Sequence, residues 1–131
     1  MECDPVRVAG LGFRSGTTVA ALRAALEAAE AKGGPVDALA TLPAKACALP
    51  LRALAAERGL PVHEVAVHGV VTPTQSARIM ALHGTGSVAE AAALACAGAA
   101  GRVKARLVVE RVASPDGMVT CAVAQGEGET Q

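Results

Sequence analysis

Residues 6–34, VRVAGLGFRSGTTVAALRAALEAAEAKGG, contain the pattern that decides the fold of this chain. The segment Val6–Leu11 is short, apolar and rich in valine, and it runs into glycines, which predicts a buried strand. Good helix formers follow from Thr17 to Lys32, with apolar residues at three- and four-residue steps, so we expect a helix there. A buried strand that leads through glycines into an amphipathic helix is typical of α/β proteins.

The next segments repeat this alternation of strand and helix. Residues 37–42 (DALATL) and 62–67 (VHEVAV) are strand candidates. Between them, Pro50–Arg58 is expected to form a short helix, with proline near its start and Gly59 just past its end. Because strands joined through helices run parallel, the first half of the sheet is expected to be parallel.

Two later helix starts carry hydroxyl caps. Thr72 is followed by Pro73 and then Gln75, which predicts one helix start. Ser87–Glu90 (SVAE) is a capping box that opens an Ala-rich helix to about Ala100. This helix has little polar surface, so it is expected either between other elements or at a subunit contact.

The C-terminal third predicts an antiparallel hairpin. Residues 105–112 and 118–124 are apolar strand candidates, and the turn sequence Ser114–Gly117 (SPDG) lies between them. Residues 125–131 are polar, and we expect them to fray. The fold class is therefore α/β: a three-layer sandwich with a mixed sheet of about five strands, parallel in its first half, and helices on both faces.

Composition limits the function. We expect one domain over residues 1–131, with residues 1–4 frayed as well. Twelve basic and twelve acidic residues give a formal net charge of zero, so no strong field gathers phosphates or anionic lipid. Phe13 is the only aromatic residue, which removes the stacking surface of single-strand binders. The apolar stretch Val88–Ala100 is too short to span a bilayer. We expect no nucleic-acid partner and no membrane association.

The cysteines are interpreted as reduced thiols. Cys3, Cys47, Cys96 and Cys121 form no CxxC pair, and no histidine lies at zinc-ligand spacing from them. We therefore expect a cytoplasmic protein with no metal site and no cofactor.

The glycine-rich loop after the first strand is a candidate anion site. Gly10, Gly12 and Gly16 bring backbone amides to a helix start, and Arg14 adds a cation that suits a carboxylate or phosphate. The spacing GxGxxxG differs from the dinucleotide motif GxGxxG, and it is not a Walker motif. A tight strand–helix turn explains the spacing equally well.

Two further segments carry candidate residues, each with a plainer alternative. Lys45 follows the second strand, where ligands of open α/β sheets bind, although a lone lysine there is more often solvated surface. In residues 83–87 (HGTGS) the glycines form a candidate anion nest, whereas Ser87 and Glu90 are more simply explained by capping. The sequence contains no nucleophile elbow and no paired-carboxylate motif, so catalytic residues are unknown.

Three segments in this order resemble the CobE/CbiG C-terminal domain family of cobalamin biosynthesis. They are GLGFRSGTT (10–18), ALATLPAKA (38–46) and HGTGSVAEAAAL (83–94), and the resemblance covers Val6 to Ala124. It implies a role in building the corrin ring. The ligand-binding candidates that it carries over are Gly10, Gly12, Arg14, Gly16, Thr17, Thr41, Lys45, Gly84, Ser87 and Glu90.

The resemblance also implies the kind of activity. Full-length CbiG opens a lactone on a cobalt-precorrin and releases acetaldehyde; it has additional N-terminal regions, which we expect this protein to lack. The stand-alone form of the family belongs mainly to organisms with the aerobic pathway. We therefore expect a protein that binds or carries a precorrin or corrinoid intermediate, whose acetate and propionate groups suit Arg14, Lys45 and the helix starts.

Two alternatives remain open. One is a precorrin lactone hydrolase, in which Lys45 or Arg14 stabilises the developing oxyanion and water attacks. The other is a non-catalytic assembly subunit that docks through its Ala-rich helix or hairpin edge on another pathway enzyme, or on itself as a homo-oligomer. With Phe13 as its only aromatic residue, the chain offers a macrocycle mainly aliphatic surface, unless the site is shared with a partner.

Overall fold

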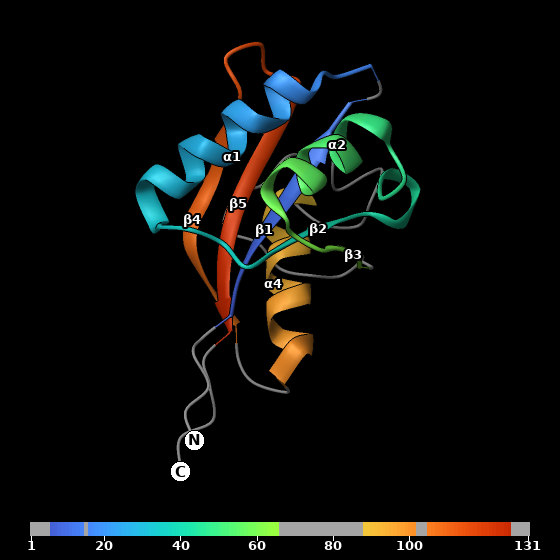
Figure 1. The fold of residues 1–131 in the computed structure, drawn as a ribbon. Helices are drawn as coiled ribbons and strands as arrows, with labels where there is room; N and C mark the ends of the chain where they lie inside the picture. Colours follow the sequence, from blue (N-terminus) through green and yellow to red (C-terminus); the bar gives the residue numbers. More distant parts are fainter. Residues whose placement is uncertain (1–5, 15, 66–87, 102–104, 127–131) are drawn as a thin grey trace.

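The architecture is a mixed β-sheet with helices on both of its faces (Figure 1). The computed structural model describes residues 6–14, 16–65, 88–101 and 105–126. In these residues the sheet has five strands in the order β3-β2-β1-β5-β4. The strands are β1 (Val6–Phe13), β2 (Ala38–Thr41), β3 (Val62–Glu64), β4 (Ala105–Ala113) and β5 (Val119–Gly126).

The two halves of the sheet differ in strand direction. β2 pairs parallel with both β1 and β3. β5 pairs antiparallel with both β1 and β4, and therefore lies between them. The mixed sheet, its parallel half and the C-terminal hairpin were all expected, and the structure confirms them. The insertion of β5 beside β1 places the hairpin in the same sheet as the parallel strands.

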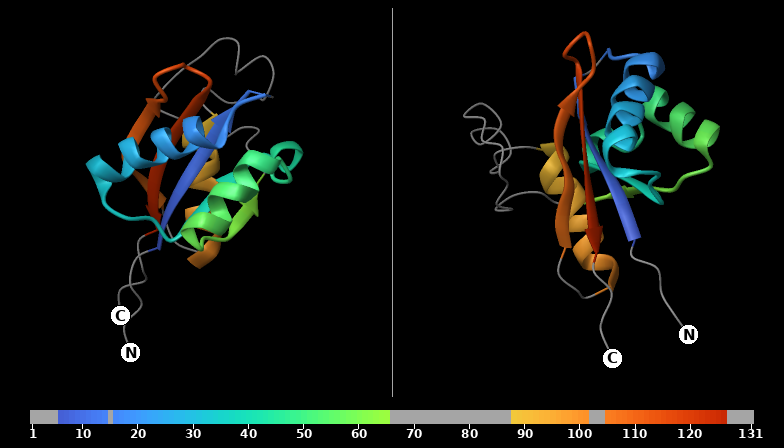
Figure 2. Two further views of the ribbon diagram at one scale, coloured as in Figure 1. Left: turned by 45° about the horizontal axis from the view of Figure 1, so that its top comes forward. Right: turned by 90° about the vertical axis from the view of Figure 1, so that its left-hand side faces the viewer.

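Helices cover both faces of the sheet (Figure 2). α1 (Val19–Gly33) and α2 (Leu49–Arg58) pack on one face, and α4 (Val88–Gly101) packs on the other. A 3-10 turn, η1 (Pro43–Lys45), connects β2 to α2. The expected three-layer arrangement is confirmed.

The two faces have cores of different composition. The α1/α2 side contains most of the large apolar side chains, such as Leu11 and Leu39, whereas the α4 side is built largely from alanines. Residues alternate along β1, so Leu11 points to the first core and Val8 to the second. Small side chains on α4 allow a close approach of helix and sheet.

Gly10 lies where α4 comes closest to β1. A Cβ on Gly10 would lie 2.5 Å from the backbone nitrogen of Ala93 and would also clash with the carbonyl oxygen of Ala89. Only a glycine fits at this point without moving the helix. The packing of α4 therefore explains this glycine.

Polar contacts fix both ends of α1. Thr18 caps its start, because the Thr18 hydroxyl accepts a hydrogen bond from the Ala21 amide at 3.1 Å. At the other end, the Arg7 guanidinium donates to the Gly33 carbonyl oxygen. Arg58 on α2 pairs with Glu30 on α1 at 2.7 Å, which joins the two helices.

Several expected boundaries shift. β1 continues to Phe13, the first helix begins at Val19 rather than Thr17, and β3 ends at Glu64. Gln125 and Gly126 were expected to fray, yet they belong to β5, because β5 gains pairing from β1 on one side and β4 on the other. The helix predicted to start at Thr72 lies outside the described residues.

None of the described helices is long and apolar enough to cross a membrane.

Candidate functional site

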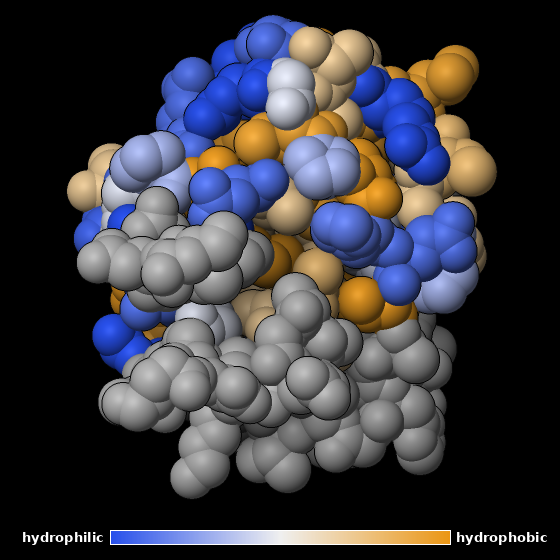
Figure 3. Space-filling view, turned by 60° about the horizontal axis from the view of Figure 1, so that its bottom comes forward, coloured by the Kyte–Doolittle hydropathy of each residue, from blue (hydrophilic) through white to orange (hydrophobic). Residues whose placement is uncertain are grey.

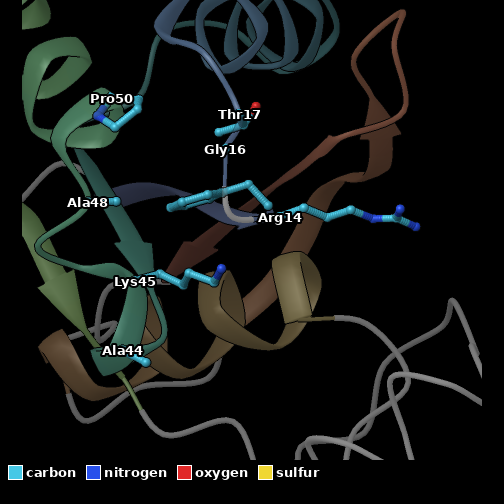
Figure 4. A pocket seen from close by; sticks show the side chains of 8 residues that line it. Arg14, Gly16, Thr17, Ala44, Lys45, Ala48 and Pro50 are labelled. Atoms are coloured by element: carbon cyan, nitrogen blue, oxygen red, sulfur yellow. The ribbon is translucent and has the colours of Figure 1, made fainter.

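A cavity of about 230 Å³ lies at the carboxyl ends of β1 and β2 (Figure 4). This is the edge of a parallel sheet where α/β proteins bind their ligands, because the strand–helix loops meet there. The loop after β1, the turn η1 and the start of α2 form its walls. The lining residues are Phe13, Arg14, Gly16, Thr17, Ala44, Lys45, Ala48 and Pro50.

Lys45 and Phe13 form a pair in the cavity wall. The Lys45 Nζ lies 5.4 Å from the centroid of the Phe13 ring, which is the distance of a cation–π contact. Lys45 belongs to η1 and Phe13 to the end of β1, so the pair joins the loops that follow two adjacent strands. The only aromatic residue of the chain therefore holds an ammonium group at this cavity.

The start of α2 lies in the cavity wall without a side-chain cap. Ala48, its N-cap, makes no side-chain cap hydrogen bond, and the first turn contains no acidic residue. The first turn of α1 also lacks an acidic residue. The partial positive charge at a helix N-terminus is therefore not compensated locally by a carboxylate at either start. Both helices favour an anion in the cavity.

Thr17 and Arg14 occupy different positions at this site. Thr17 is buried, and its Oγ1 has no hydrogen-bond partner in the part of the chain that the structure describes. Arg14 is exposed, and Figure 4 shows its side chain directed away from Lys45. Lys45 is therefore the cation in the cavity wall, and Arg14 lies outside at its rim.

Glu90, at the start of α4, is fully buried and contacts the edge strand. Its carboxylate accepts a hydrogen bond from the Arg111 backbone amide at 2.9 Å. The β4–β5 register shifts between Val109 and Val112, so one extra β4 residue leaves the ladder there. Glu90 satisfies a backbone donor at this irregularity.

The comparisons with known proteins identify the family. The family described as "Cobalamin synthesis G C-terminus" matches residues 7–124. This chain belongs to that family. It is a cobalamin biosynthesis protein of the CobE/CbiG C-terminal type.

Two solved structures of cobalamin proteins are similar to this family member. The structure of CobE, a protein from the cobalamin (vitamin B12) biosynthetic pathway, has a TM-score of 0.84 and 31% identity over 99% of this chain and 96% of that one. The cobalamin biosynthesis protein chiG from Agrobacterium tumefaciens str. C58 has a TM-score of 0.65 and 40% identity over 91% of this chain and 97% of that one. No curated protein matches.

In this CbiG C-terminal domain the three motifs contribute unequally to the cavity. From the first two motifs, Arg14, Gly16, Thr17 and Lys45 come together around it. From the third motif, Glu90 is buried against β4, while Gly84 and Ser87 lie outside the described residues.

Three other motif residues lie away from the cavity lining. Gly10 packs under α4. The buried Thr41 hydroxyl donates to the Leu11 carbonyl oxygen at 2.9 Å, which ties β2 to β1. Gly12 is close to the Thr120 hydroxyl and to Val88, each of which would crowd a Cβ. The contacts of Gly10, Gly12 and Thr41 thus hold the fold together and do not line the cavity.

Sequence reasoning missed the contribution of α2. Ala48 and Pro50 line the cavity, and Phe13 contacts Lys45. The proline at the helix start was noted as a boundary signal, although it also marks a helix N-terminus at the carboxyl edge of the sheet. The position of Pro50 was therefore the sequence signal that the start of α2 forms part of the cavity wall.

The site carries no recognisable metal centre in the described residues, which contain no group of three or more His, Cys, Asp or Glu placed to hold an ion. Burial raises the pKa of the Cys121 thiol, with a smaller contribution from Glu30, to about 12. Burial also raises the pKa of Cys96. Both thiols belong to the cores and not to the cavity.

Proposed function

We propose that this protein binds a precorrin or corrinoid intermediate through the carboxylates on the edge of its ring, and holds it without converting it. We further propose that it does so in the cytoplasm and in the aerobic branch of the pathway. Family membership supports the ligand class, since such intermediates are the substrates of cobalamin biosynthesis. The cysteine pattern of the sequence supports the compartment.

The observation that carries the proposal is the chemistry of the cavity lining. It combines a lysine, an arginine at the rim and the uncapped start of α2, and the described lining residues include no carboxylate. Among the described lining residues, an anionic group meets the positive charges of Lys45 and Arg14 and the positive end of the α2 dipole. Acetate and propionate groups have this chemistry.

The same lining supports binding over hydrolysis. A hydrolytic water needs a general base within hydrogen-bond reach, usually a histidine or a carboxylate. The described lining residues include neither, although Lys45 would suit an oxyanion. The hydrolase alternative thus has a stabilising group but no histidine or carboxylate among the lining residues that the structure describes.

The described structure also weakens one version of the assembly alternative. Residues 88–97 of the Ala-rich helix are buried or half-buried within the chain itself, so this part of α4 presents little surface to a partner. Contacts with other pathway enzymes, if they form, would use other surfaces.

A spectral titration tests the proposal. Hydrogenobyrinic acid, a cobalt-free corrinoid that carries acetate and propionate groups, is added to the purified protein while its visible spectrum is followed. We expect a saturable change at micromolar concentration and co-elution on gel filtration. Absence of both would overturn the proposal. Acetaldehyde released from a lactone-bearing precorrin would instead support the hydrolase.

A further inference from the structure

The cavity is too small for the macrocycle of the proposed ligand. The cavity of about 230 Å³ suits a small group rather than a ring system. Cavities that enclose a whole drug-sized ligand span about 300–1,000 Å³. An acetate or propionate group fits in this space, whereas a tetrapyrrole ring system does not.

We propose that the cavity is an anchor for a single carboxylate arm, and that the ring itself stays outside and rests on an apolar rim centred on Leu49. This inference rests on the proposed function, because it specifies how the same ligand sits at the same site. It divides the site into a charged inner part and an apolar outer part.

The inner part is arranged for one carboxylate. Lys45 Nζ is held over the Phe13 ring at 5.4 Å, and both residues line the cavity beside the uncapped start of α2. A carboxylate in the cavity meets the Lys45 ammonium and the positive end of the α2 dipole, whereas Pro50 itself has no amide hydrogen to donate. The Phe13 ring and Ala44 supply apolar walls that suit the methylene groups of the arm.

The outer part follows from one exposed side chain. Leu49 lies between Ala48 and Pro50, which both line the cavity, and 82% of Leu49 is exposed. It is the only large apolar residue so exposed in the described part of the chain. Pro43 and Ala44, at the start of η1, are also exposed, which extends the apolar character of the rim.

The end of the molecule seen in Figure 3 has a mixed surface. That view looks at the end of the molecule with the chain termini, opposite the cavity, and hydrophilic and hydrophobic residues interleave over its described part. Leu49, which lies in the sequence between two lining residues, is the exposed large apolar residue of the described surface. An apolar ring face that covers Leu49 would remove it from water.

The test compares one ligand in two charge states on matched variants. Hydrogenobyrinic acid and its heptamethyl ester share the ring, but the ester carries no carboxylate. Both are titrated into the wild type and into Lys45→Gln, Leu49→Ser and Leu49→Met. Arg52→Gln is the charge control, because Arg52 is exposed on α2 and does not line the cavity. Thermal melts establish that each variant is folded.

The anchor predicts different effects for the two ligands. We expect Lys45→Gln to raise the Kd of the acid about tenfold, from the loss of a charge-assisted hydrogen bond, without changing that of the ester. Leu49→Ser should raise both Kd values by similar factors of about five. Leu49→Met keeps an apolar side chain of similar size and should leave both Kd values near those of the wild type. Arg52→Gln should leave both Kd values within about twofold.

The outcomes separate this inference from the proposed function. If the wild type binds neither ligand, the proposed function fails. If the acid binds but Lys45→Gln weakens acid and ester equally, the carboxylate anchor is wrong while binding stands. If both ligands bind Leu49→Ser as tightly as wild type, the ring does not rest on this rim. If the ligand-free wild type is a dimer and Leu49→Ser is a monomer, the rim binds a second copy of the chain and not the ring, which would overturn the proposal.

Discussion

At the scale of single residues, the cavity rim and the cavity wall carry one positive charge each. Arg14 is exposed at the rim, and its side chain is directed away from Lys45 (Figure 4). We expect Arg14→Ala to weaken hydrogenobyrinic acid binding about threefold to tenfold, because an exposed ion pair contributes roughly 0.2–1 kcal/mol and a charged hydrogen bond somewhat more.

The stability of Arg14→Ala is the control for that measurement. Exposed substitutions away from structural contacts usually change the free energy of unfolding by less than about 0.5 kcal/mol. An unchanged urea midpoint together with an unchanged Kd would show that the site is misplaced.

The thiols differ in reactivity because they differ in burial. Cys47 is exposed, whereas Cys96 and Cys121 are buried. The thiolate is the reactive form, and burial raises the pKa of Cys121 to about 12. Mass spectrometry after brief iodoacetamide treatment at pH 8 should therefore find Cys47 labelled, and Cys96 and Cys121 labelled only in urea. Rapid native labelling of Cys121 would contradict the packing of β5 against α1.

At the scale of elements, the contact of β1 with α4 depends on a glycine. In Gly10→Ala the new methyl group meets backbone atoms of Ala89 and Ala93, which cannot rotate away. Overpacking of this kind typically costs about 1–3 kcal/mol, so the urea midpoint should fall clearly. The matched variant is Gly12→Ala, whose methyl group meets the Thr120 hydroxyl at 3.0 Å and the Val88 side chain at 3.4 Å. Side chains adjust more easily, so this change should cost less; equal losses would contradict the close approach of α4.

The contact of α4 with β4 depends on Glu90. Glu90→Ala leaves the Arg111 amide without this acceptor, and an unsatisfied buried donor costs about 1–3 kcal/mol. Glu90→Gln retains an acceptor oxygen and should destabilise less. Both variants should keep wild-type ligand affinity once folded, because Glu90 does not line the cavity. Loss of binding in a fully folded Glu90→Gln would restore Glu90 as a ligand-binding residue.

At the scale of the whole molecule, the buried thiol of Cys121 makes stability depend on pH. Its pKa is raised to about 12 in the folded state, so the thiol stays neutral there while it ionises in the unfolded chain. Its contribution to stability is complete below the ordinary thiol pKa of about 8.5 and is lost as pH rises from there toward about 12. Urea unfolding at pH 7 and pH 10 should show a steeper decline for wild type than for Cys121→Ala. Parallel declines would contradict this assignment.

The sequence alone determined the class of the molecule and its family. Strand and helix periods, the glycines at Gly10, Gly12 and Gly16 and the SPDG turn of the hairpin are local signals, and local signals report elements directly. Three short motifs in order were sufficient to indicate the family, which the match over residues 7–124 confirms. Strand ends were less accurate, as Gln125 shows, because pairing with neighbouring strands extends a strand beyond its own signal.

Only the tertiary structure decided which motif residues share a site. Gly10 and Lys45 belong to motifs with similar apparent roles, yet Gly10 lies beneath α4 while Lys45 meets Phe13 at the cavity. The reason is that strand order and the face on which each residue points depend on long-range packing, which no local pattern encodes. The GxGxRxG segment at residues 10–16, which runs from β1 into the following loop, thus serves two purposes. Its first glycine, Gly10, accommodates α4, and its end lines the cavity.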